Sequence, residues 1–313
     1  MLDVCRHYMP VEDIKRLLRA AQFCGVNKMH WHLADDQGWR IEIKKSPRLT
    51  QVGAVRGDSF FGAVSETEHN CGFYTQEQAK DIVAYAQDCG IDVIPEIEIP
   101  GHAGAMLAAY PEFGCRRTVV DKDDKEQIIE EPYRYQVETA GGIFPHLICA
   151  GKDASVDFLK DILDEVSELF PYPAVHIGGD EAPKTMWQSC PDCAARMKKL
   201  GLSEPEQLQG YFTCRVAEML RRHGKKPVCW NEALRAGRVP EDVQVIGYDG
   251  LRAFGDQDYY CSTIIQPVEE LGTAAGEQIL QRIEEPDAPV LEKVLTSAYR
   301  PYSPPGAWAP SQR

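Results

Sequence analysis

The chain has 313 residues, of which 43% are hydrophobic and 26% are charged, and its formal net charge is −14. This length and balance are those of a soluble globular protein that buries a sizeable core, as one large barrel or as two ordinary domains. The acidic surplus argues against nucleic acid or an anionic membrane as a partner, since both need a basic surface, and no apolar run approaches the roughly 20 residues of a membrane span.

Short strand-like runs alternate with helical stretches through residues 1–235. The candidate strands are Leu2–Cys5, Lys28–Leu33, Asp92–Ile97, Ala174–Ile177 and Pro227–Trp230. Such alternation is typical of consecutive βαβ units, which build a parallel sheet with helices outside it. We therefore predict an α/β fold for this part of the chain.

Amphipathic helices are predicted between these strands. The first begins at Pro10 and has one apolar face: Ile14, Leu17, Leu18 and Ala21. The next begins at Thr75, an N-cap residue with Gln78 three positions later, and ends at Gly90. Two further stretches have the same apolar period: 155–169 and 206–222. Residues 110–150 are predicted to be a long irregular insertion, and loops of that length in a compact enzyme usually border a site.

The cysteines and the N-terminus predict a reducing compartment. Eleven cysteines at mostly irregular spacing do not make a disulfide framework, and Met1 leads directly into a strand instead of a secretory leader, so we expect a cytoplasmic location. Cys190 and Cys193 are spaced like half of a zinc site, but no second Cys-x-x-Cys or His pair completes four ligands. The preferred interpretation is two loop thiols, with no metal and no cofactor.

Polar side chains that can carry chemistry follow four of the predicted strands directly. They are Arg6-His7, Asp35-Asp36, Glu96 with Glu98 and His102, and Asp180-Glu181. In a (β/α) barrel the catalytic residues gather at the carboxyl ends of the strands. Four such groups in register therefore favour a barrel with an active site at that end.

The segment His176-Ile-Gly-Gly-Asp180-Glu181 is the most informative of these groups. Its two glycines let the backbone pass close to a ligand before two adjacent carboxylates project from the strand end. Repulsion between neighbouring carboxylates should raise the pKa of one of them, which suits a general acid. The alternative is a helix N-terminus that carries acidic residues for the helix dipole.

Several motifs in the same order resemble the catalytic domain of glycoside hydrolase family 20. They are Leu2–Tyr8, His30–Arg40 (His-Trp-His-Leu-Ala-Asp-Asp-Gln-Gly-Trp-Arg), Ile94–His102, the His-Ile-Gly-Gly-Asp-Glu run and Val228–Glu232. The resemblance covers about residues 1–236. It implies a (β/α)8 TIM-type barrel and the activity of a β-N-acetylhexosaminidase, which releases terminal β-linked GlcNAc or GalNAc from an oligosaccharide or small-molecule substrate with retained configuration.

The resemblance also implies a substrate-assisted mechanism, an exception to the usual two-carboxylate scheme. Glu181 would protonate the glycosidic oxygen and later deprotonate the incoming water. Asp180 would orient the 2-acetamido group, whose carbonyl oxygen attacks the anomeric carbon to give an oxazolinium ion, and would stabilise the positive charge that develops.

Four further residues receive binding roles from the resemblance. Arg6 would bind the sugar's 3- and 4-hydroxyls with support from Asp35, His102 would line the pocket and position the acid–base pair, and Trp230 would form a wall of the acetamido pocket. The alternatives are a surface arginine, a hydrogen-bonded loop histidine and a core tryptophan. The sequence does not decide whether Trp39 and Trp187 pack in the core or contact the aglycone.

Beyond about residue 238 the sequence no longer follows the family pattern. The Tyr-x-Asp motif, which in the family grips the acetamido oxygen, is not found there. Two runs instead resemble the last part of lac-repressor-type sugar-sensing domains, Val239–Gly250 and Thr263–Gly272, followed by a helix at about 268–284. We therefore predict a catalytic barrel at 1–238 that is incomplete at its C-terminal end, and an atypical tail at 239–313. Val243–Tyr248 is the one candidate for a sixth strand.

Two other functions remain open. A catalytically impaired relic would keep the sugar pocket but lack the acetamido clamp. A fragment of a sugar-responsive regulator is suggested by the tail and opposed by the absence of DNA-binding helices.

Overall fold

The computed structural model describes residues 1–57, 59–61, 64–66, 70–120, 128–236, 244–247, 262–265, 270, 273–274, 276–277, 281 and 298–300. The chain forms two compact units, Met1–Gln244 and Val245–Arg313. The first unit carries every residue predicted for the site. The predicted boundary at residue 238 lies a few residues before the division between these units.

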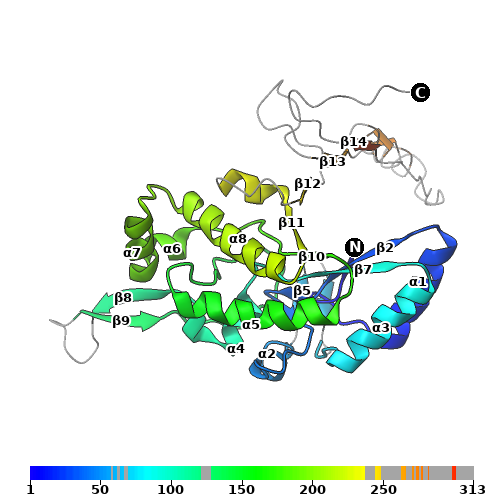
Figure 1. Cartoon of the computed structure of the whole chain (residues 1–313), viewed down its shortest axis with the longest axis horizontal. Coiled ribbons are helices and arrows are strands. Elements are labelled where there is room, and N and C mark those ends of the chain that lie inside the picture. The colour runs from blue at the N-terminus through cyan, green and yellow to red at the C-terminus, as the bar shows by residue number, and fades with distance from the viewer. Residues whose placement is uncertain are drawn as a thin grey trace. The chain divides into compact units, whose positions relative to one another are not determined.

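Five strands form a parallel sheet in the first unit, and their order in the sheet is their order along the chain (Figure 1). They are β1 (Leu2–Asp3), β2 (Lys28–His32), β7 (Asp92–Glu96), β10 (Ala174–His176) and β11 (Lys226–Trp230). Each neighbouring pair is parallel. The five predicted strands and the α/β class are confirmed, and the consecutive parallel order is that of a (β/α) barrel.

Four long helices connect these strands and lie outside the sheet, with α1 packed beside α3 and α5 beside α8 (Figure 1). They are α1 (Val11–Phe23), α3 (Gln76–Asp88), α5 (Asp153–Leu169) and α8 (Pro205–Arg222). The N-cap predicted at Thr75 is confirmed as a capping box, because Thr75 Oγ1 accepts from the Gln78 backbone N–H at 3.2 Å while Gln78 Oε1 accepts from the Thr75 backbone N–H at 2.9 Å.

Shorter elements form the loops around the strand ends. The helical turns are α2 (Arg48–Gln51), α4 (Gly104–Ala109), η1 (Pro111–Phe113), α6 (Thr185–Ser189), α7 (Pro191–Leu200) and η2 (Asn231–Ala236). The antiparallel strand pairs are β3 (Ala34–Asp35) with β4 (Gly38–Trp39), β5 (Ser59–Phe61) with β6 (Val64–Glu66), and β8 (Arg116–Val120) with β9 (Ile128–Pro132).

The insertion at 110–150 is more regular than the sequence predicted. It begins with η1 and continues as the β8–β9 hairpin, which extends away from the helices beside α7 (Figure 1). Its later part returns to the strand ends, where the Glu138 backbone N–H donates to the Asp36 carbonyl at 2.9 Å. The β-branched residues at 118–120 and 128–129 explain the hairpin. The prediction that the insertion borders the site is confirmed by the contact with Asp36.

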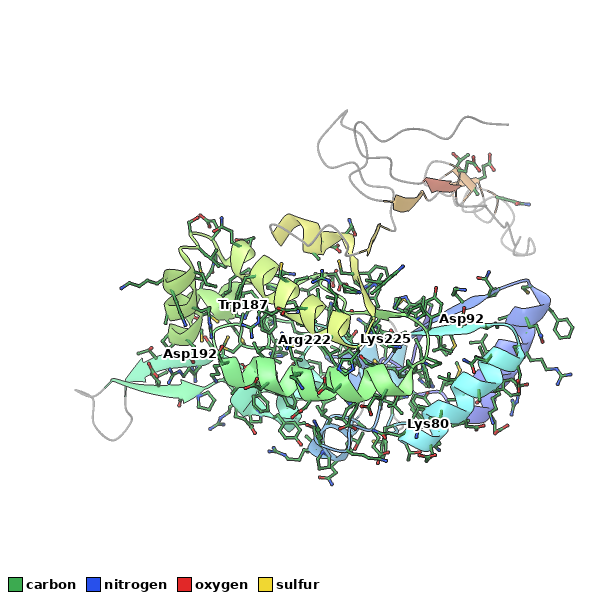
Figure 2. All side chains as sticks on the ribbon, viewed as in Figure 1. Lys80, Asp92, Trp187, Asp192, Arg222 and Lys225 are labelled. Carbon is green, nitrogen blue, oxygen red and sulfur yellow. The ribbon has the colours of Figure 1, made fainter. Side chains whose placement is uncertain are left out.

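Two tryptophans that the sequence left undecided are core residues. Trp39 and Trp187 are fully buried, and their indole N–H groups donate to the backbone carbonyls of Ile41 at 2.6 Å and Ile148 at 3.0 Å. Because each indole has its hydrogen-bond partner inside the protein, both side chains pack the fold instead of meeting an aglycone. Trp187 is labelled in Figure 2.

Three further strands are described, and the first of them, β12, begins at the last residue of the first unit. β12 (Gln244–Gly247) lies within the predicted Val243–Tyr248, and β13 (Ser262–Ile265) pairs with it in parallel. β14 (Ala298–Arg300) pairs with β13 in the antiparallel direction, which a regular (β/α)8 barrel does not contain. The described positions within the predicted helix at 268–284 are helical, and the other residues of that prediction lie outside the described part of the chain.

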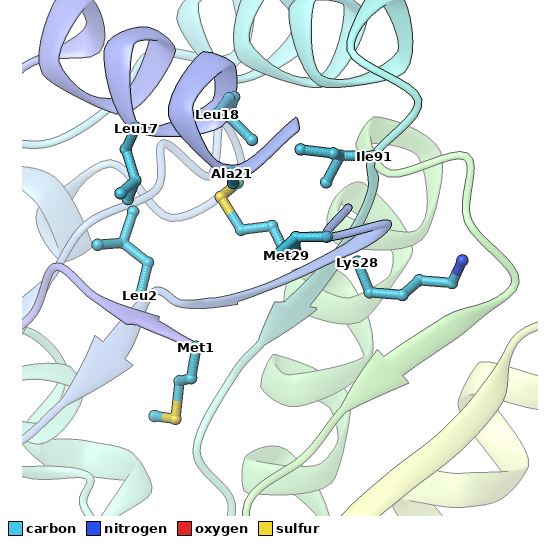
Figure 3. Close-up of a pocket in the computed structure, with 9 residues that line it drawn as sticks. Met1, Leu2, Leu17, Leu18, Ala21, Lys28, Met29 and Ile91 are labelled. Carbon is cyan, nitrogen blue, oxygen red and sulfur yellow. The ribbon is translucent and has the colours of Figure 1, made fainter. Parts of the chain in front are cut away.

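An apolar pocket lies at the amino ends of β1, β2 and β7, opposite the site (Figure 3). Leu17 lines it and is 43% exposed, so one residue of the predicted apolar face of α1 is not in the core. The amino ends of barrel strands serve stability and not chemistry, so this pocket gives no support to a catalytic role. Among the described residues, no helix has the length and apolar character that a membrane crossing requires.

Candidate active site

The residues predicted for the site lie at the carboxyl ends of five neighbouring strands. Direct contacts link five of them in a chain from Arg6 through Asp35 and His102 to the pair Asp180 and Glu181. The sixth, Trp230, ends β11, and its backbone N–H donates to the Gly178 carbonyl at 2.9 Å. Loops after parallel strands converge at one end of the sheet, which brings together residues far apart in sequence.

Arg6 is held by a turn that ends β1. The Asp3 carboxylate accepts from the backbone N–H groups of Cys5 and Arg6, and its other oxygen contacts the Arg6 guanidinium at 2.7 Å. The guanidinium also contacts Asp35 at 2.8 Å and donates to Gln37 Oε1 at 2.9 Å. Burial alone would lower the pKa of Arg6, but Asp35 and Asp3 outweigh it and raise that pKa above its ordinary value. The arginine is therefore a fixed cation at the rim of the site.

Asp35 is the buried centre of this charged group. It contacts His32 Nε2 at 2.7 Å and His102 Nδ1 at 3.3 Å in addition to Arg6. Burial alone would raise the pKa of Asp35, but His102, His32 and Arg6 together hold it well below its usual range. Asp35 is therefore ionised and supports Arg6, as the sequence predicted.

His102 joins the two halves of the site. Its Nδ1 lies 3.1 Å from Asp36 Oδ2, and its Nε2 lies 3.5 Å from Glu181 Oε2 and 3.9 Å from Asp180 Oδ2. Burial opposes a charge on the ring, but the hydrogen bonds to Asp35 and Asp36 raise the pKa of His102 to about 11. At neutral pH the ring is an imidazolium that faces both predicted catalytic carboxylates. His102 is thus a hydrogen-bonded loop histidine, as in the alternative interpretation, and it also contacts both predicted catalytic carboxylates.

Asp180 and Glu181 differ in environment although they are neighbours. The Asp180 side chain is 23% exposed and the Glu181 side chain 44% exposed. Burial raises the pKa of Asp180 to about 6, with Glu96 and Glu232 adding to the effect and His102 opposing it. The sequence argument expected the raised pKa to come from repulsion within the pair, whereas burial is the larger cause. Asp180 Oδ1 is buried and has no hydrogen-bond partner among the described residues.

The backbone at the site is held in an uncommon conformation. Among the described residues, His102 and Glu181 are the two non-glycine residues with a positive φ, at 48° and 38°. A side chain in this region costs roughly 1–3 kcal/mol, and such residues cluster at functional sites. The same two side chains are in contact, so the strain is confined to the region where the site's two halves meet.

A buried cluster of histidines and glutamate lies beneath these residues. The sheet register places His32 opposite Glu96 and Glu96 opposite His176, so these side chains point to the same face of three adjacent strands. Glu96 contacts His32 at 2.5 Å, His30 at 2.8 Å and His176 at 2.7 Å. Burial would raise the pKa of Glu96, but His176 and His32 lower it well below its ordinary value.

This cluster supports Trp230. The half-buried Trp230 ring lies 4.6 Å from the His176 ring and 5.6 Å from the His30 ring, measured between centroids. Trp230 lies at the end of β11 and packs against the histidine rings, so its side chain is not fully enclosed in the core. The geometry is that of a side wall.

Gly178 is required by a close approach. A Cβ at this position would lie 1.7 Å from Glu98 Oε2, and φ is 65°. Glu98 is buried, and its burial together with the charge of Asp180 raises its pKa well above the ordinary value. The raised pKa favours the neutral form of Glu98 beside Asp180. Gly178, predicted to let the backbone pass close to a ligand, instead lets it pass close to a side chain of the protein.

Five further residues of the site received no specific role from the sequence, although two of them, Glu96 and Glu98, were expected at a strand end: Gln37, His32, Glu96, Glu98 and His176. The signal for His32 was available, because His30 and His32 alternate on one strand and must share a face. Their contact with Glu96 depends on the register between strands, which one sequence does not show. The carboxylate and imidazole groups of this region could in principle hold a cation, but they already form ion pairs with one another.

The interpretation of Cys190 and Cys193 as two loop thiols without further ligands requires correction. The structure brings Cys115 and Cys149 to them, and the four sulfurs lie within 4.8 Å of one another. These two cysteines come from opposite ends of the insertion, so no second Cys-x-x-Cys spacing marks them in the sequence.

Comparison with known proteins agrees with this geometry. The model of the family "Glycosyl hydrolase family 20, catalytic domain" matches residues 1–258. The chain belongs to glycosyl hydrolase family 20. The match extends past residue 238, where the resemblance was predicted to end, and includes β12.

Three relatives illustrate the similarity. A β-hexosaminidase of Porphyromonas gingivalis is 45% identical over 240 residues, which are 77% of this chain and 28% of the relative. The β-N-acetylhexosaminidase of Bacteroides fragilis is 37% identical with a TM-score of 0.66, over 80% of this chain and 45% of the other. A Vibrio harveyi exo-β-N-acetylglucosaminidase in complex with N-acetylglucosamine is 31% identical with a TM-score of 0.65, over 88% of this chain and 39% of the other. The chain spans less than half the length of each.

Proposed function

We propose that this family 20 domain hydrolyses terminal β-linked N-acetylhexosamine by a retaining, substrate-assisted reaction. The observation that carries the proposal is the buried Oδ1 of Asp180, a carboxylate oxygen with no hydrogen-bond partner in the part of the chain that the structure describes, next to the exposed Glu181. An acceptor left open in a buried position needs a donor, and the N–H of a 2-acetamido group is one. The Vibrio harveyi relative holds N-acetylglucosamine, which supports this class of substrate.

The proposed reaction starts from protonated Glu181. Its proton passes to the glycosidic oxygen while the acetamido carbonyl oxygen attacks the anomeric carbon, and the bond to the leaving group breaks. Asp180 accepts the acetamido N–H and offsets the positive charge of the resulting oxazolinium ion. Water then gives a proton to Glu181 and attacks the anomeric carbon, which breaks the bond to the acetamido oxygen and restores the starting state. The two displacements retain configuration.

Arg6 and Trp230 supply binding in this proposal. The Arg6 guanidinium, fixed by Asp3 and Asp35, presents its remaining donors to the sugar hydroxyls. Trp230 forms an apolar wall at the end of β11. The imidazolium of His102 lies opposite both carboxylates, places a positive charge beside them and helps to fix their position.

A thiazoline analogue of N-acetylglucosamine tests the proposal, because it mimics the cyclised intermediate and not the intact substrate. It should inhibit hydrolysis of aryl β-N-acetylglucosaminides competitively, with an inhibition constant at least about a hundredfold below that of N-acetylglucosamine. In Asp180→Asn, which keeps the shape of the side chain and removes its charge, the preference for the thiazoline should fall while N-acetylglucosamine binding changes less. A covalent sugar trapped on an Asp or Glu side chain would refute the mechanism.

A further inference from the structure

A cluster of four buried cysteines lies apart from the residues of the proposed reaction. Cys115 precedes β8 and Cys149 closes the insertion, while Cys190 and Cys193 flank the start of α7. All four side chains are at most 1% exposed. The chain thus brings three separate segments together to place four sulfurs in one enclosed space.

The sulfur spacing fits tetrahedral metal coordination. Cys149 Sγ lies 3.8 Å from Cys190 Sγ and 3.7 Å from Cys193 Sγ, and the four sulfurs lie within 4.8 Å of one another. A tetrahedral Zn²⁺ site with Zn–S bonds of about 2.3 Å has sulfur–sulfur edges of about 3.8 Å. The four residues are thiols, and a disulfide would need two sulfurs at about 2.05 Å.

The backbone around the sulfurs is fixed by contacts that involve no metal. Arg116, next to Cys115, forms a two-pronged ion pair with Asp192, at 2.7 and 2.6 Å. A Cβ at Gly151 would lie 2.2 Å from the Asp192 carbonyl carbon, so the Cys-Pro-Asp-Cys turn packs directly on the chain that follows Cys149. Asp192 is labelled in Figure 2 beside the base of the hairpin. These contacts hold the ligands in place before a metal binds.

We propose that Cys115, Cys149, Cys190 and Cys193 bind one structural Zn²⁺ ion. Four thiolates in a closed tetrahedron select zinc and leave no open position for a substrate, which makes the site structural and not catalytic. The proposal is independent of the hydrolase activity, because the cluster shares no residue with the reaction described above.

A metal bound by the four cysteines would hold the two ends of the insertion in a fixed position. Cys115 and Cys149 are its two ends, and the metal joins both to α7, which starts ten residues after Glu181. Between these ends the insertion reaches the site, where Gln37 Nε2 donates to the Ala140 carbonyl at 2.9 Å. Gln37 in turn accepts from Arg6. The zinc site would therefore stabilise the loop that supports the sugar-binding arginine.

Metal analysis of the full chain, purified under reducing conditions from zinc-containing medium, tests the proposal. We expect about one zinc per chain in the wild type and in the control Cys24→Ser, whose cysteine is exposed at the end of α1, and none in Cys193→Ser. Removal of the metal by a chelator should lower the melting temperature of the wild type by about 5–10 °C and leave the Cys193→Ser value unchanged.

Cobalt substitution keeps the test decisive if Cys193→Ser does not fold. Co²⁺ in the wild-type site should give thiolate-to-metal charge-transfer absorption and the visible bands of a tetrahedral ion. Cys193→His, which retains four ligands, should still bind one metal but with weaker charge-transfer absorption, because one thiolate is lost. Purified wild-type chain without zinc that shows no cobalt bands, or a disulfide between any two of the four cysteines, would overturn the proposal, and bound iron would overturn the choice of zinc.

Discussion

The two sides of the active site differ in how far the protein satisfies their charges. On the side of β1 and β2, Arg6 has three side-chain partners and Asp35 contacts a guanidinium and two imidazoles. On the side of β10, Asp180 has a buried oxygen without a partner among the described residues, and Glu181 is 44% exposed. Groups that bind and orient a substrate are built in advance, whereas groups that change their bonding during a reaction are left open to the substrate.

The largest effect is expected on the open side. Glu181→Gln removes the proton donor, so turnover of β-N-acetylglucosaminides with poor leaving groups should fall by about 10²–10⁴-fold. The loss should be much smaller with good leaving groups, because their oxygens need no proton. Rates measured across a series of aryl substrates check this, with Glu77→Gln, an exposed residue of α3, as the control. An equal loss across the series would remove Glu181 from the acid role.

A smaller effect is expected on the satisfied side. Arg6→Lys keeps the charge but loses the fork that reaches Asp3, Asp35 and Gln37 together, and hydrogen bonds to charged groups are worth about 1.5–3 kcal/mol. We therefore expect KM to rise about 10- to 100-fold with a smaller change in kcat. Steady-state kinetics of Arg6→Lys beside Arg16→Lys, a surface arginine, measure the difference. An unchanged KM would mean that this side of the site is not a sugar-binding surface.

The smallest change in maximal rate, and the sharpest test of the link between the two sides, concerns His102. The pKa of Asp180 is raised to about 6, so kcat/KM of the wild type should fall as the pH decreases through that value and Asp180 takes up a proton. His102→Gln removes an imidazolium that favours the ionised carboxylate. The pKa of Asp180 should then rise further, by about 1–3 units, and the acidic limb should move to higher pH.

A pH profile with a substrate that has a good leaving group measures this shift without interference from proton donation. Asp180→Asn should lack the limb altogether. His223→Gln, at an exposed histidine paired with Asp164, is the matched control and should leave the profile unchanged. If the limb of His102→Gln coincides with that of the wild type, then the two sides are not electrostatically linked and the role given to His102 is wrong.

The sequence predicted the secondary structure and the positions of the site residues better than the contacts among their side chains. The five strands and four long helices were predicted correctly, because apolar periodicity is a local property of the sequence. The six named residues lie at strand ends as predicted, because the position directly after a strand is also local. The contacts of Glu96 with three histidines were not predicted, since they depend on the register of three strands. The cause of the raised pKa at Asp180 was also missed, because burial depends on what the rest of the chain places around a residue.

The cysteines show most clearly what sequence and tertiary structure each decide. The spacing of Cys190 and Cys193 indicates by itself that two sulfurs lie close together, since three positions are close to the 3.6 residues of one helical turn. Cys115 and Cys149 lie 34 positions apart and carry no such signal. The insertion between them forms a hairpin and returns, so that its two ends meet beside α7 and bring the four sulfurs within 4.8 Å. Short-range spacing is written in the chain, whereas the closing of a long loop follows from the packing of the elements on either side of it.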